Sequence, residues 1–414
     1  MIEILGDFQK TTCLGSFIAG IDSSGRKTDK SHASLNLSPG LREAEPSPRR
    51  RSKSSGTSKE SAFSPTCHTN EHCESFFYHN MTNDRYVPRA ILIDADPGAM
   101  NDLQAGSYGM LFDPGNFVFG VEGTANNWAK GFYTYGSQLG EEILETIARE
   151  VERCDSLAGI QLFHSIGGGT GSGLGSYTLS RLLRDEYSGS IRCTYTVSPS
   201  PVHSDVVLEP YNALLSVHHL VESSDMSVIY SNTALQDVST ALLLQPSLSP
   251  FTLNTLIARS VSIITSGMRF PSADAVSLRK LCQATVPFHR LHLLMPSLAP
   301  LRTVPYDRPS VSSVLKQLFH PRYSLCRMHS TSMLHPVKSC TDVTEGNTLI
   351  SGACVFRGEG SVVEMEDEIA RYVRQHLHNF IDYIPNSISV AHTPVPSPYS
   401  PLSAVLLSNS SGKV

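Results

Sequence analysis

The sequence lacks the features of a membrane-spanning or secreted protein. No apolar run reaches the ~18 residues of a membrane-spanning helix, and the N-terminus has no basic segment followed by an apolar one. The nine cysteines are scattered singly and odd in number, which argues against a disulfide framework. The sequence also lacks an excess of positive charge. Its net charge of −5 gives no support for general nucleic-acid binding. We therefore expect a soluble intracellular protein, and 414 residues suffice for two or three domains.

Residues 24–60 differ in composition from the rest of the chain. They hold nine basic residues, four acidic residues and nine serines, with few large apolar side chains. Because so little apolar surface can offset the entropy of ordering, we expect residues 24–75 to be a disordered, basic, serine-rich segment. Such a segment is usually a solvated tail, and nuclear import or control by phosphorylation is the alternative.

Short apolar strands and amphipathic helices alternate after this segment. Strands are predicted at residues 90–93, 117–120, 159–166 and 192–197. Leu139, Ile143, Ile147 and Val151 recur at helical spacing between the second and third of these strands. Polar loops that contain glycine follow the strand ends. The pattern predicts a doubly wound α/β sheet whose ligand binds beyond the C-terminal ends of the strands.

A second α/β domain is predicted beyond a buried helix. Residues 252–268 are apolar around most of the helical circumference, as in a helix buried between two layers. Further strands are predicted at residues 290–295, 349–357 and 404–407, with a helix at 365–380. The predicted divisions are a first strand and loop region at 1–23, a nucleotide-binding domain at 76–249, a core helix at 250–270 and a second domain at 271–414.

The most informative motif is a glycine-rich run at residues 167–173. It lies between the predicted strand at 159–166 and a helix-like stretch at 174–187. Its glycines leave backbone N–H groups unshielded, and it opens onto a helix N-terminus, where the helix dipole favours negative charge. We therefore predict that this loop binds phosphate groups. The predicted phosphate-binding residues of the run are Gly167, Gly168, Gly169, Thr170, Gly171 and Ser172.

Three other glycine motifs do not fit this run. A P-loop needs Lys followed by Ser or Thr after its last glycine, whereas Leu174 follows here. No register supplies the G-x-G-x-x-G fingerprint, which argues against an NAD-dependent enzyme. A nucleophile elbow needs a glycine two residues before its serine, but Thr170 precedes Ser172 at that distance. A flexible linker is the remaining alternative, but linkers do not join a buried strand to an amphipathic helix.

Several separate motifs, all in the expected order, resemble the tubulins. They are RAILIDADPGAM at 89–100, NNWAKG at 126–131, GGGTGSG at 167–173, EPYN at 209–212, RFP at 269–271 and VPFHRLH at 286–292. The resemblance is continuous from about residue 86 to about residue 409. It implies a tubulin/FtsZ-like α/β fold, with a Rossmann-type GTPase domain, a core helix and a second α/β intermediate domain. The alternation of apolar strands and amphipathic helices predicts the same division.

The resemblance also implies a site for GTP or GDP with Mg²⁺. Asp94 and Asp96 resemble the acidic pair that handles magnesium or its waters, and hard oxygen ligands suit that ion. Residues 123–127 resemble the loop that senses the terminal phosphate, through Gly123 and Asn126. The implied ribose-binding and guanine-binding residues are Asp205, Glu209, Asn232 and Asn254. Because an amide both donates and accepts hydrogen bonds, a pair of asparagines can discriminate guanine. A role as a loop or cap residue is the alternative for each of these side chains.

The sequence departs from the family pattern at several positions. Residues 1–23 give only a faint echo of the family's glycine- and amide-rich first loop, and the chain stops at Val414 without the C-terminal helices and acidic tail. Ala125 adds a Cβ in a turn that favours glycine. Pro250 occupies the position of the guanine-stacking aromatic residue. Lys280 replaces the glutamate with which α-tubulin activates water for its neighbour's GTP, which is the β-like arrangement.

These observations predict a divergent, non-canonical tubulin of the delta or zeta kind. ERCDSLAG at 152–159 and SSD at 223–225 resemble the delta type, whereas much of 84–300 resembles the β type. We expect a guanine-nucleotide-binding structural protein of the cytoplasmic cytoskeleton that associates with centrioles, basal bodies or cilia. Its expected partners are other tubulins or centriolar proteins, and any GTP hydrolysis is expected to be weak and completed in trans. The alternative is a nucleotide-free, truncated pseudo-tubulin that acts as an interaction protein, or an incomplete gene model.

Overall fold

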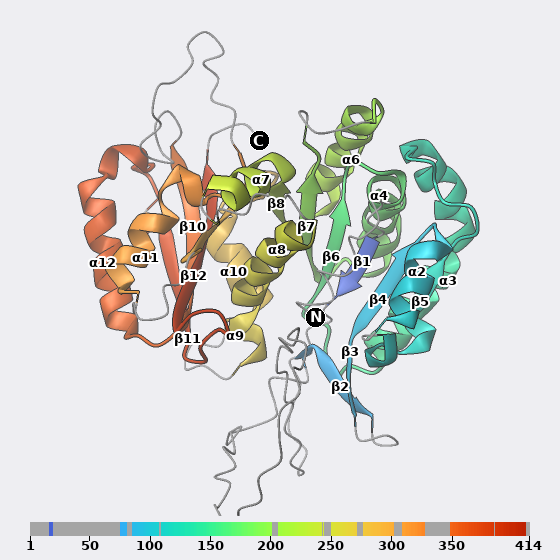
Figure 1. The fold of residues 1–414 in the computed structure, drawn as a ribbon, viewed down its shortest axis with the longest axis horizontal. Helices are drawn as coiled ribbons and strands as arrows, with labels where there is room; N and C mark the ends of the chain where they lie inside the picture. The colour runs from blue at the N-terminus through green and yellow to red at the C-terminus, as the bar shows by residue number, and fades with distance from the viewer. Residues whose placement is uncertain are drawn as a thin grey trace, which may run out of the picture.

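The computed structural model describes eleven parts of the chain. They are residues 16–19, 75–80, 85–106, 109–200, 206–241, 243, 250–270, 276–301, 309–327, 348–384 and 386–410. One large sheet crosses the described part, and helices cover both of its faces (Figure 1). The basic, serine-rich segment predicted over residues 24–75 lies outside the described residues, apart from Ser75. No helix in the described part is long and apolar enough to cross a membrane.

The large sheet contains ten strands. In their order across the sheet they are β11 (Ile388–Thr393), β10 (Leu349–Gly358), β12 (Leu402–Ser410), β9 (Leu293–Ala299), β8 (Met226–Ser231), β7 (Ile191–Ser198), β6 (Gly159–Ser165), β1 (Ser16–Ala19), β4 (Ala90–Asp94) and β5 (Phe117–Phe119). Strands β6 to β9 are parallel, as are β4 and β5. Because β1 is antiparallel to both β4 and β6, those two strands run in the same direction. The C-terminal ends of β4, β5, β6, β7 and β8 therefore meet at one edge of the sheet, whereas β1 ends at the opposite edge.

Helices follow most of these strands. They are α2 (Pro97–Ala105), α3 (Gly136–Glu152), α4 (Gly175–Tyr177), α5 (Arg184–Glu186), α6 (Glu209–Ser223), α7 (Asn232–Ala241), α8 (Pro250–Ile264), α9 (Ser266–Arg269), α10 (Leu278–Thr285), α11 (Val311–Leu318) and α12 (Val362–Gln375). Wider π-type turns precede α3 at Lys130–Tyr135 and flank α4 at Thr170–Leu174 and Thr178–Leu183. The strands predicted in the first half lie within a residue or two of their predicted positions. The strand predicted at 290–295 begins later, at Leu293, because the backbone of Arg290 has a φ of 70°, which a strand does not adopt.

The first half of the sheet is buried on both faces. Along β4, Ala90 and Leu92 contribute to one hydrophobic core, whereas Ile91 and Ile93 contribute to the other. This explains why β4 reads as a continuous apolar run rather than an alternating one. The helix α3 and the segment after β6 cover one face, and α2, α8 and α10 cover the other.

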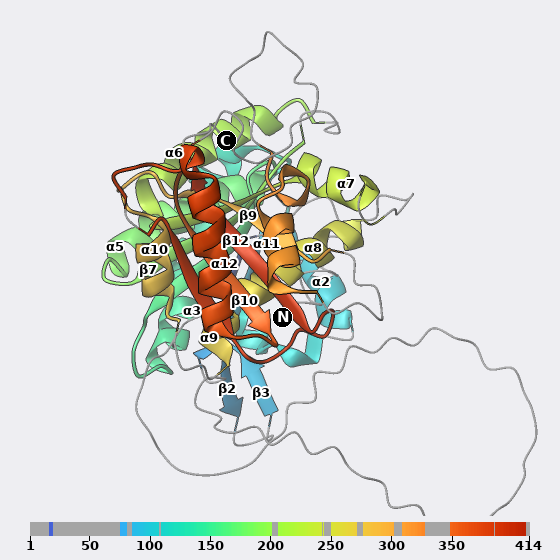
Figure 2. The same ribbon diagram turned by 90° about the vertical axis from the view of Figure 1, so that its left-hand side faces the viewer.

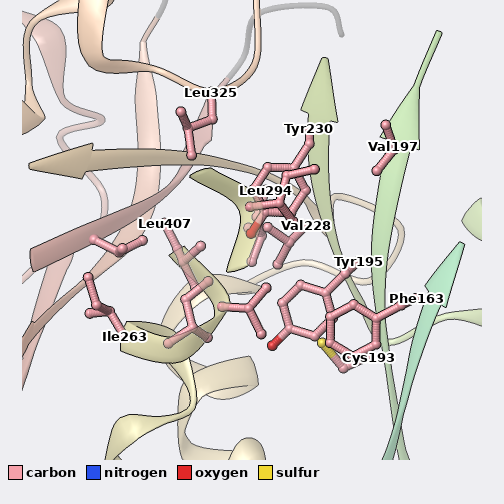
Figure 3. Packing of buried hydrophobic residues seen from close by; sticks show 14 of the residues in the cluster. Phe163, Cys193, Tyr195, Val197, Val228, Tyr230, Ile263, Leu294, Leu325 and Leu407 are labelled. Atoms are coloured by element: carbon pink, nitrogen blue, oxygen red, sulfur yellow. The ribbon is translucent and has the colours of Figure 1, made fainter. Parts of the chain in front are cut away.

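The helix α8 joins the two halves of the molecule. Its buried side chains share one core with Phe163 and Tyr195 of the first half and with Leu407 of β12 (Figure 3). Phe163 and Tyr195 stack with ring centroids 4.4 Å apart. In addition, β8 pairs with β9 in parallel, so the sheet is continuous from one half to the other. In the second half, α11 and α12 lie side by side over the sheet (Figure 2).

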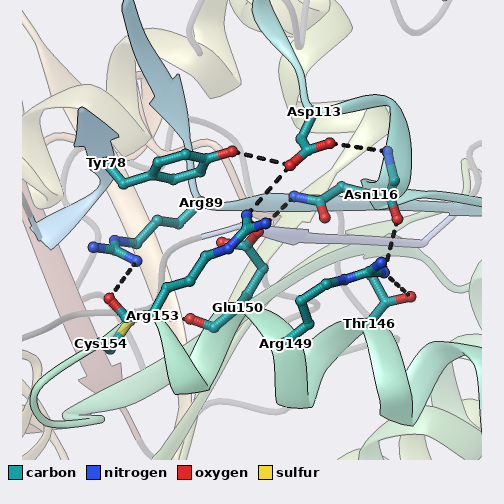
Figure 4. A network of polar contacts seen from close by, with 10 residues as sticks. Tyr78, Arg89, Asp113, Asn116, Thr146, Arg149, Glu150, Arg153 and Cys154 are labelled. Carbon is teal, nitrogen blue, oxygen red and sulfur yellow. Dashed lines mark hydrogen bonds and ion pairs between the residues drawn. The ribbon is translucent and has the colours of Figure 1, made fainter. Parts of the chain in front are cut away.

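A polar network fixes the small hairpin of β2 (Phe77–Asn80) and β3 (Arg85–Pro88) to the end of α3 (Figure 4). Tyr78 donates a hydrogen bond to Asp113 at 3.0 Å, and Arg153 lies 3.3 Å from the same carboxylate. The fully buried Glu150 accepts from Arg153 at 2.7 Å and from Asn116 at 3.0 Å. Because a buried carboxylate is costly unless it is paired, these bonds hold α3 and the start of β5 in a fixed relation.

Candidate functional site

Two acidic residues lie at the C-terminal end of β4. Asp94 is the last residue of this strand and is buried. Asp96 is exposed and caps the first turn of α2, where its Oδ1 accepts from the N–H of Gly98 at 3.0 Å. The backbone N–H of Asp96 in turn donates to Oδ1 of Asp94 at 3.2 Å. The structure thus brings the two predicted acidic residues together but gives them different surroundings.

The carboxylate of Asp94 is only partly compensated. Burial raises its pKa to about 6, against the lowering effect of hydrogen bonds from the backbone of Asp96 and the side chain of Thr170. Its second oxygen, Oδ2, is buried and has no hydrogen-bond partner among the described residues. A buried oxygen of this kind needs an explanation, and a bound cation or an ordered water supplies one. The donor set therefore fits a hard divalent ion.

The loop at residues 123–127 has an unusual backbone. Gly123, Ala125 and Asn126 all have positive φ, at 68°, 51° and 55°. Thr124 is buried, and its hydroxyl lies 3.4 Å from the hydroxyl of Thr170 in the glycine loop. The turn therefore confirms that Ala125 stands where glycine is favoured.

An Ala125→Gly substitution is expected to stabilise the protein by about 1 kcal/mol, because it removes the steric strain of a Cβ in the left-handed region. Ala129 provides a matched control, because its φ of −64° and ψ of −39° are helical. There, Ala129→Gly should destabilise by about 0.5–1 kcal/mol. Urea unfolding of the three proteins measures both effects, and a loss of stability in Ala125→Gly would contradict the strain.

The glycine loop packs directly against the loop at 123–127. A Cβ at Gly169 would collide with the side chain of Thr124 and would lie 2.7 Å from the backbone nitrogen of Asn127. A Cβ at Gly168, in contrast, would meet only Oδ1 of Asn126, at 3.9 Å. The Ser172 hydroxyl donates to the Gly168 carbonyl oxygen and closes the loop on itself. Gly168 therefore faces open space beside Asn126, and most of the loop around it is buried.

Asn212 bridges the two loops, and its place in EPYN was the only sign of it in the sequence. Its Nδ2 donates to the carbonyl oxygens of Asn126 at 2.8 Å and Gly167 at 3.0 Å. Its Oδ1 accepts from the N–H of Trp128 at 3.1 Å. One buried amide therefore fixes the distance between two loops that are remote in the sequence.

His164 supports the glycine loop through a hydrogen bond to its backbone. No role was predicted for this residue from the sequence. Burial lowers its pKa to about 4, so the ring is neutral at physiological pH. Its Nδ1 lies 2.9 Å from the Gly171 carbonyl oxygen, and its Nε2 lies 3.1 Å from the hydroxyl of Thr196. Because a carbonyl oxygen only accepts, Nδ1 carries the proton and Nε2 accepts from Thr196.

The structure describes only some of the residues that the family resemblance implies for binding the ribose and guanine. Glu209 begins α6, and a Cβ built on Gly167 would lie 3.6 Å from its carboxyl carbon. Asn232 directly follows β8 at the edge where the glycine loop lies. Asn254 is buried in α8, the helix that packs against α7. Asp205 and the side chain of Pro250 lie outside the described residues.

Comparison with known proteins agrees with this architecture. Residues 55–240 match the family described as Tubulin/FtsZ family, GTPase domain, and residues 289–412 match the Tubulin C-terminal domain. A curated relative, the tubulin beta-1 chain of Colletotrichum gloeosporioides, is 39% identical over 337 residues, which are 81% of this chain and 72% of that protein. The chain belongs to the tubulin family. It is a cytoskeletal protein of a family that assembles with other tubulins, and its GTPase domain implies binding of GTP or GDP.

Proposed function

We propose that the edge of the sheet formed by the ends of β4, β6, β7 and β8 holds a guanine nucleotide with Mg²⁺. The observation that carries the proposal is the contact between the loops at 123–127 and 167–173. Their packing leaves Gly168 facing open space beside Asn126, and the side chain of Thr170 in the same loop hydrogen-bonds to Asp94. Backbone donors of the glycine loop would hold the phosphates, and Gly123 and Asn126 would contact the terminal phosphate.

The magnesium ion would be held by Asp94 and by waters that Asp96 orients, because Asp94 offers a buried oxygen that no described group satisfies. Asp205 and Glu209 would bind the ribose. The amides of Asn232 and Asn254 would read the guanine edge. The ion would supply positive charge against the phosphates when it is bound.

We further propose a specialised rather than bulk role in the cytoplasmic cytoskeleton. The delta-like segments at 152–159 and 223–225 favour a non-canonical tubulin of centrioles, basal bodies or cilia that assembles with other tubulins or with centriolar proteins. Lys280 lacks the carboxylate with which the α-type glutamate would activate water, so this chain would not trigger hydrolysis in a neighbouring subunit. Any hydrolysis of its own GTP would be weak and completed in trans.

A second candidate function is that of a nucleotide-free pseudo-tubulin that acts through protein contacts. The direction of β1 favours it. Ala19, the last residue of β1, pairs with Ala90, whereas Asp94 lies at the other end of β4. The C-terminal end of β1 therefore lies at the edge opposite to the acidic pair, away from the proposed phosphates.

Nucleotide content separates the two candidates. We expect the monodisperse protein from gel filtration to release close to one guanine nucleotide per chain when it is denatured and the supernatant is chromatographed. Monodisperse protein that is folded by circular dichroism and releases no nucleotide would contradict the nucleotide site and support the pseudo-tubulin.

A further inference from the structure

An open cavity lies on the surface of the second half of the molecule, and none of its lining residues belongs to the glycine loop. It has a volume of about 530 Å³ and lies at α11 and the short helix Pro321–Tyr323 that follows it. The side chains of α11 on its other face are buried against β9 and β12. The residues that line the cavity include Ser310, Ser313, Lys316, His320 and Arg322.

The lining is rich in hydrogen-bond donors and basic groups, and it contains no acidic residue. Lys316 and Arg322 are exposed, and neither forms an ion pair with a carboxylate in the described part of the chain. The nearby Arg327, in contrast, pairs with Asp237. In a chain with a net charge of −5, two such cations around one cavity are a local excess of positive charge.

Local hydrogen bonds fix the walls of this cavity. The Ser310 hydroxyl oxygen caps α11 by accepting from the N–H of Ser313 at 3.2 Å. Nδ1 of His320 accepts from the N–H of Arg322 at 3.2 Å and caps the following short helix. Because Nδ1 acts as an acceptor, the ring proton lies on Nε2, which is left to donate. The backbone that carries the two cations is thus set before any ligand binds.

We propose that this cavity binds a phosphomonoester group. Such a group carries about −1.5 to −2 charges near neutral pH and three strong acceptor oxygens. Lys316 and Arg322 together supply two cationic side chains, and the serine hydroxyls and Nε2 of His320 supply further hydrogen-bond donors. A single carboxylate would leave one of the two cations without compensation. The planar fork of Arg322 suits two phosphate oxygens at once, and Lys316 acts as a point charge.

The proposal does not depend on the nucleotide site, since none of the lining residues belongs to the loops at 123–127 or 167–173. Binding is tested on full-length protein with GDP present at saturating concentration, so that any phosphate site at the glycine loop is occupied. Two probes are titrated by isothermal calorimetry: glycerol phosphate, and a peptide that contains one phosphoserine, with its unphosphorylated form as the blank. Stronger binding of the ester indicates a free organic phosphate as the source, and stronger binding of the peptide indicates a phosphorylated protein segment.

The variants Lys316→Ala and Arg322→Ala should each weaken the better probe about tenfold or more, because each removes a charged hydrogen-bond partner. Arg374→Ala is the matched control, because Arg374 is an exposed cation on the neighbouring helix α12 and its loss changes the net charge equally. It should leave the affinity within about twofold, as expected for an exposed, screened charge that does not line the cavity. Failure of both probes to saturate the wild-type protein would overturn the proposal. An equal loss in all three variants would overturn it as well, since it would show unspecific attraction.

Discussion

A Gly173→Ala variant is expected to lose its guanine nucleotide and to be clearly less stable than the wild type. A Cβ at this position would collide with the carbonyl oxygen of Trp128 and would lie 2.9 Å from both Cα of Gly131 and the backbone nitrogen of Phe132. All three neighbours are backbone atoms, so no side-chain rotation relieves the contact. The two loops must separate, and the cradle between them opens.

The expected loss of stability is about 1–3 kcal/mol, as for other overpacked sites. The nucleotide content should fall from about one per chain to the detection limit, because the phosphate donors belong to the displaced loop. Chromatography of the released nucleotide and thermal unfolding of the nucleotide-stripped protein measure the two effects separately. Full nucleotide content in a stable Gly173→Ala variant would contradict the role of the close packing.

Two other glycines make this experiment specific. A Cβ at Gly189 has no heavy atom within 4 Å, so Gly189→Ala should match the wild type in both measurements. Gly168→Ala should fold as the wild type does, since its nearest neighbour is 3.9 Å away. If the phosphates occupy the open space at Gly168, however, its methyl group will weaken nucleotide binding without any loss of stability. The three glycines therefore separate damage to the fold from damage to the site.

The strands that carry this site could be predicted from the sequence because each has a strong local signal. β4 and β6 are apolar runs that end abruptly, one in acidic residues and one in glycines. The order of the motifs was enough to indicate the family, and the family matches confirm the α/β fold with its two parts. The contact between the loops at 123–127 and 167–173, in contrast, has no local signal in the sequence. It depends on Asn212, which is 45 residues from Gly167 and 86 from Asn126.

Tertiary context explains the other features that the sequence did not reveal. A buried histidine such as His164 is normally a core residue. Only its hydrogen bond to the carbonyl oxygen of Gly171 shows that it supports the glycine loop. The strand β8 was not predicted, although its pairing with β9 makes the sheet continuous between the halves. The antiparallel direction of β1 is likewise a property of pairing, which periodicity cannot show.

Asp94→Asn is expected to raise the stability of the metal-free, nucleotide-free protein at pH 7.5. In the folded state the pKa of Asp94 is raised by burial from 3.8 to about 6. A raised carboxyl pKa means that the stability contributed by the protonated form is fully present below pH 3.8 and is lost as the pH rises through 6. At pH 7.5 the buried, ionised carboxylate therefore destabilises the protein by about 3 kcal/mol, and a neutral amide avoids this.

The same substitution should abolish the stabilisation that Mg²⁺ gives to the nucleotide-bound protein, because a neutral amide oxygen binds this ion more weakly than a carboxylate. Thermal unfolding between pH 4.5 and pH 8, with and without Mg²⁺, tests both statements, and the advantage of Asp94→Asn should shrink towards pH 4.5. Asp96→Asn is the stability control: this side chain is exposed, and asparagine caps a helix as well as aspartate does. A metal-free Asp94→Asn protein that is less stable than the wild type at pH 7.5 would mean that the buried carboxylate is already compensated. In that case, its orphaned oxygen would no longer point to a cation.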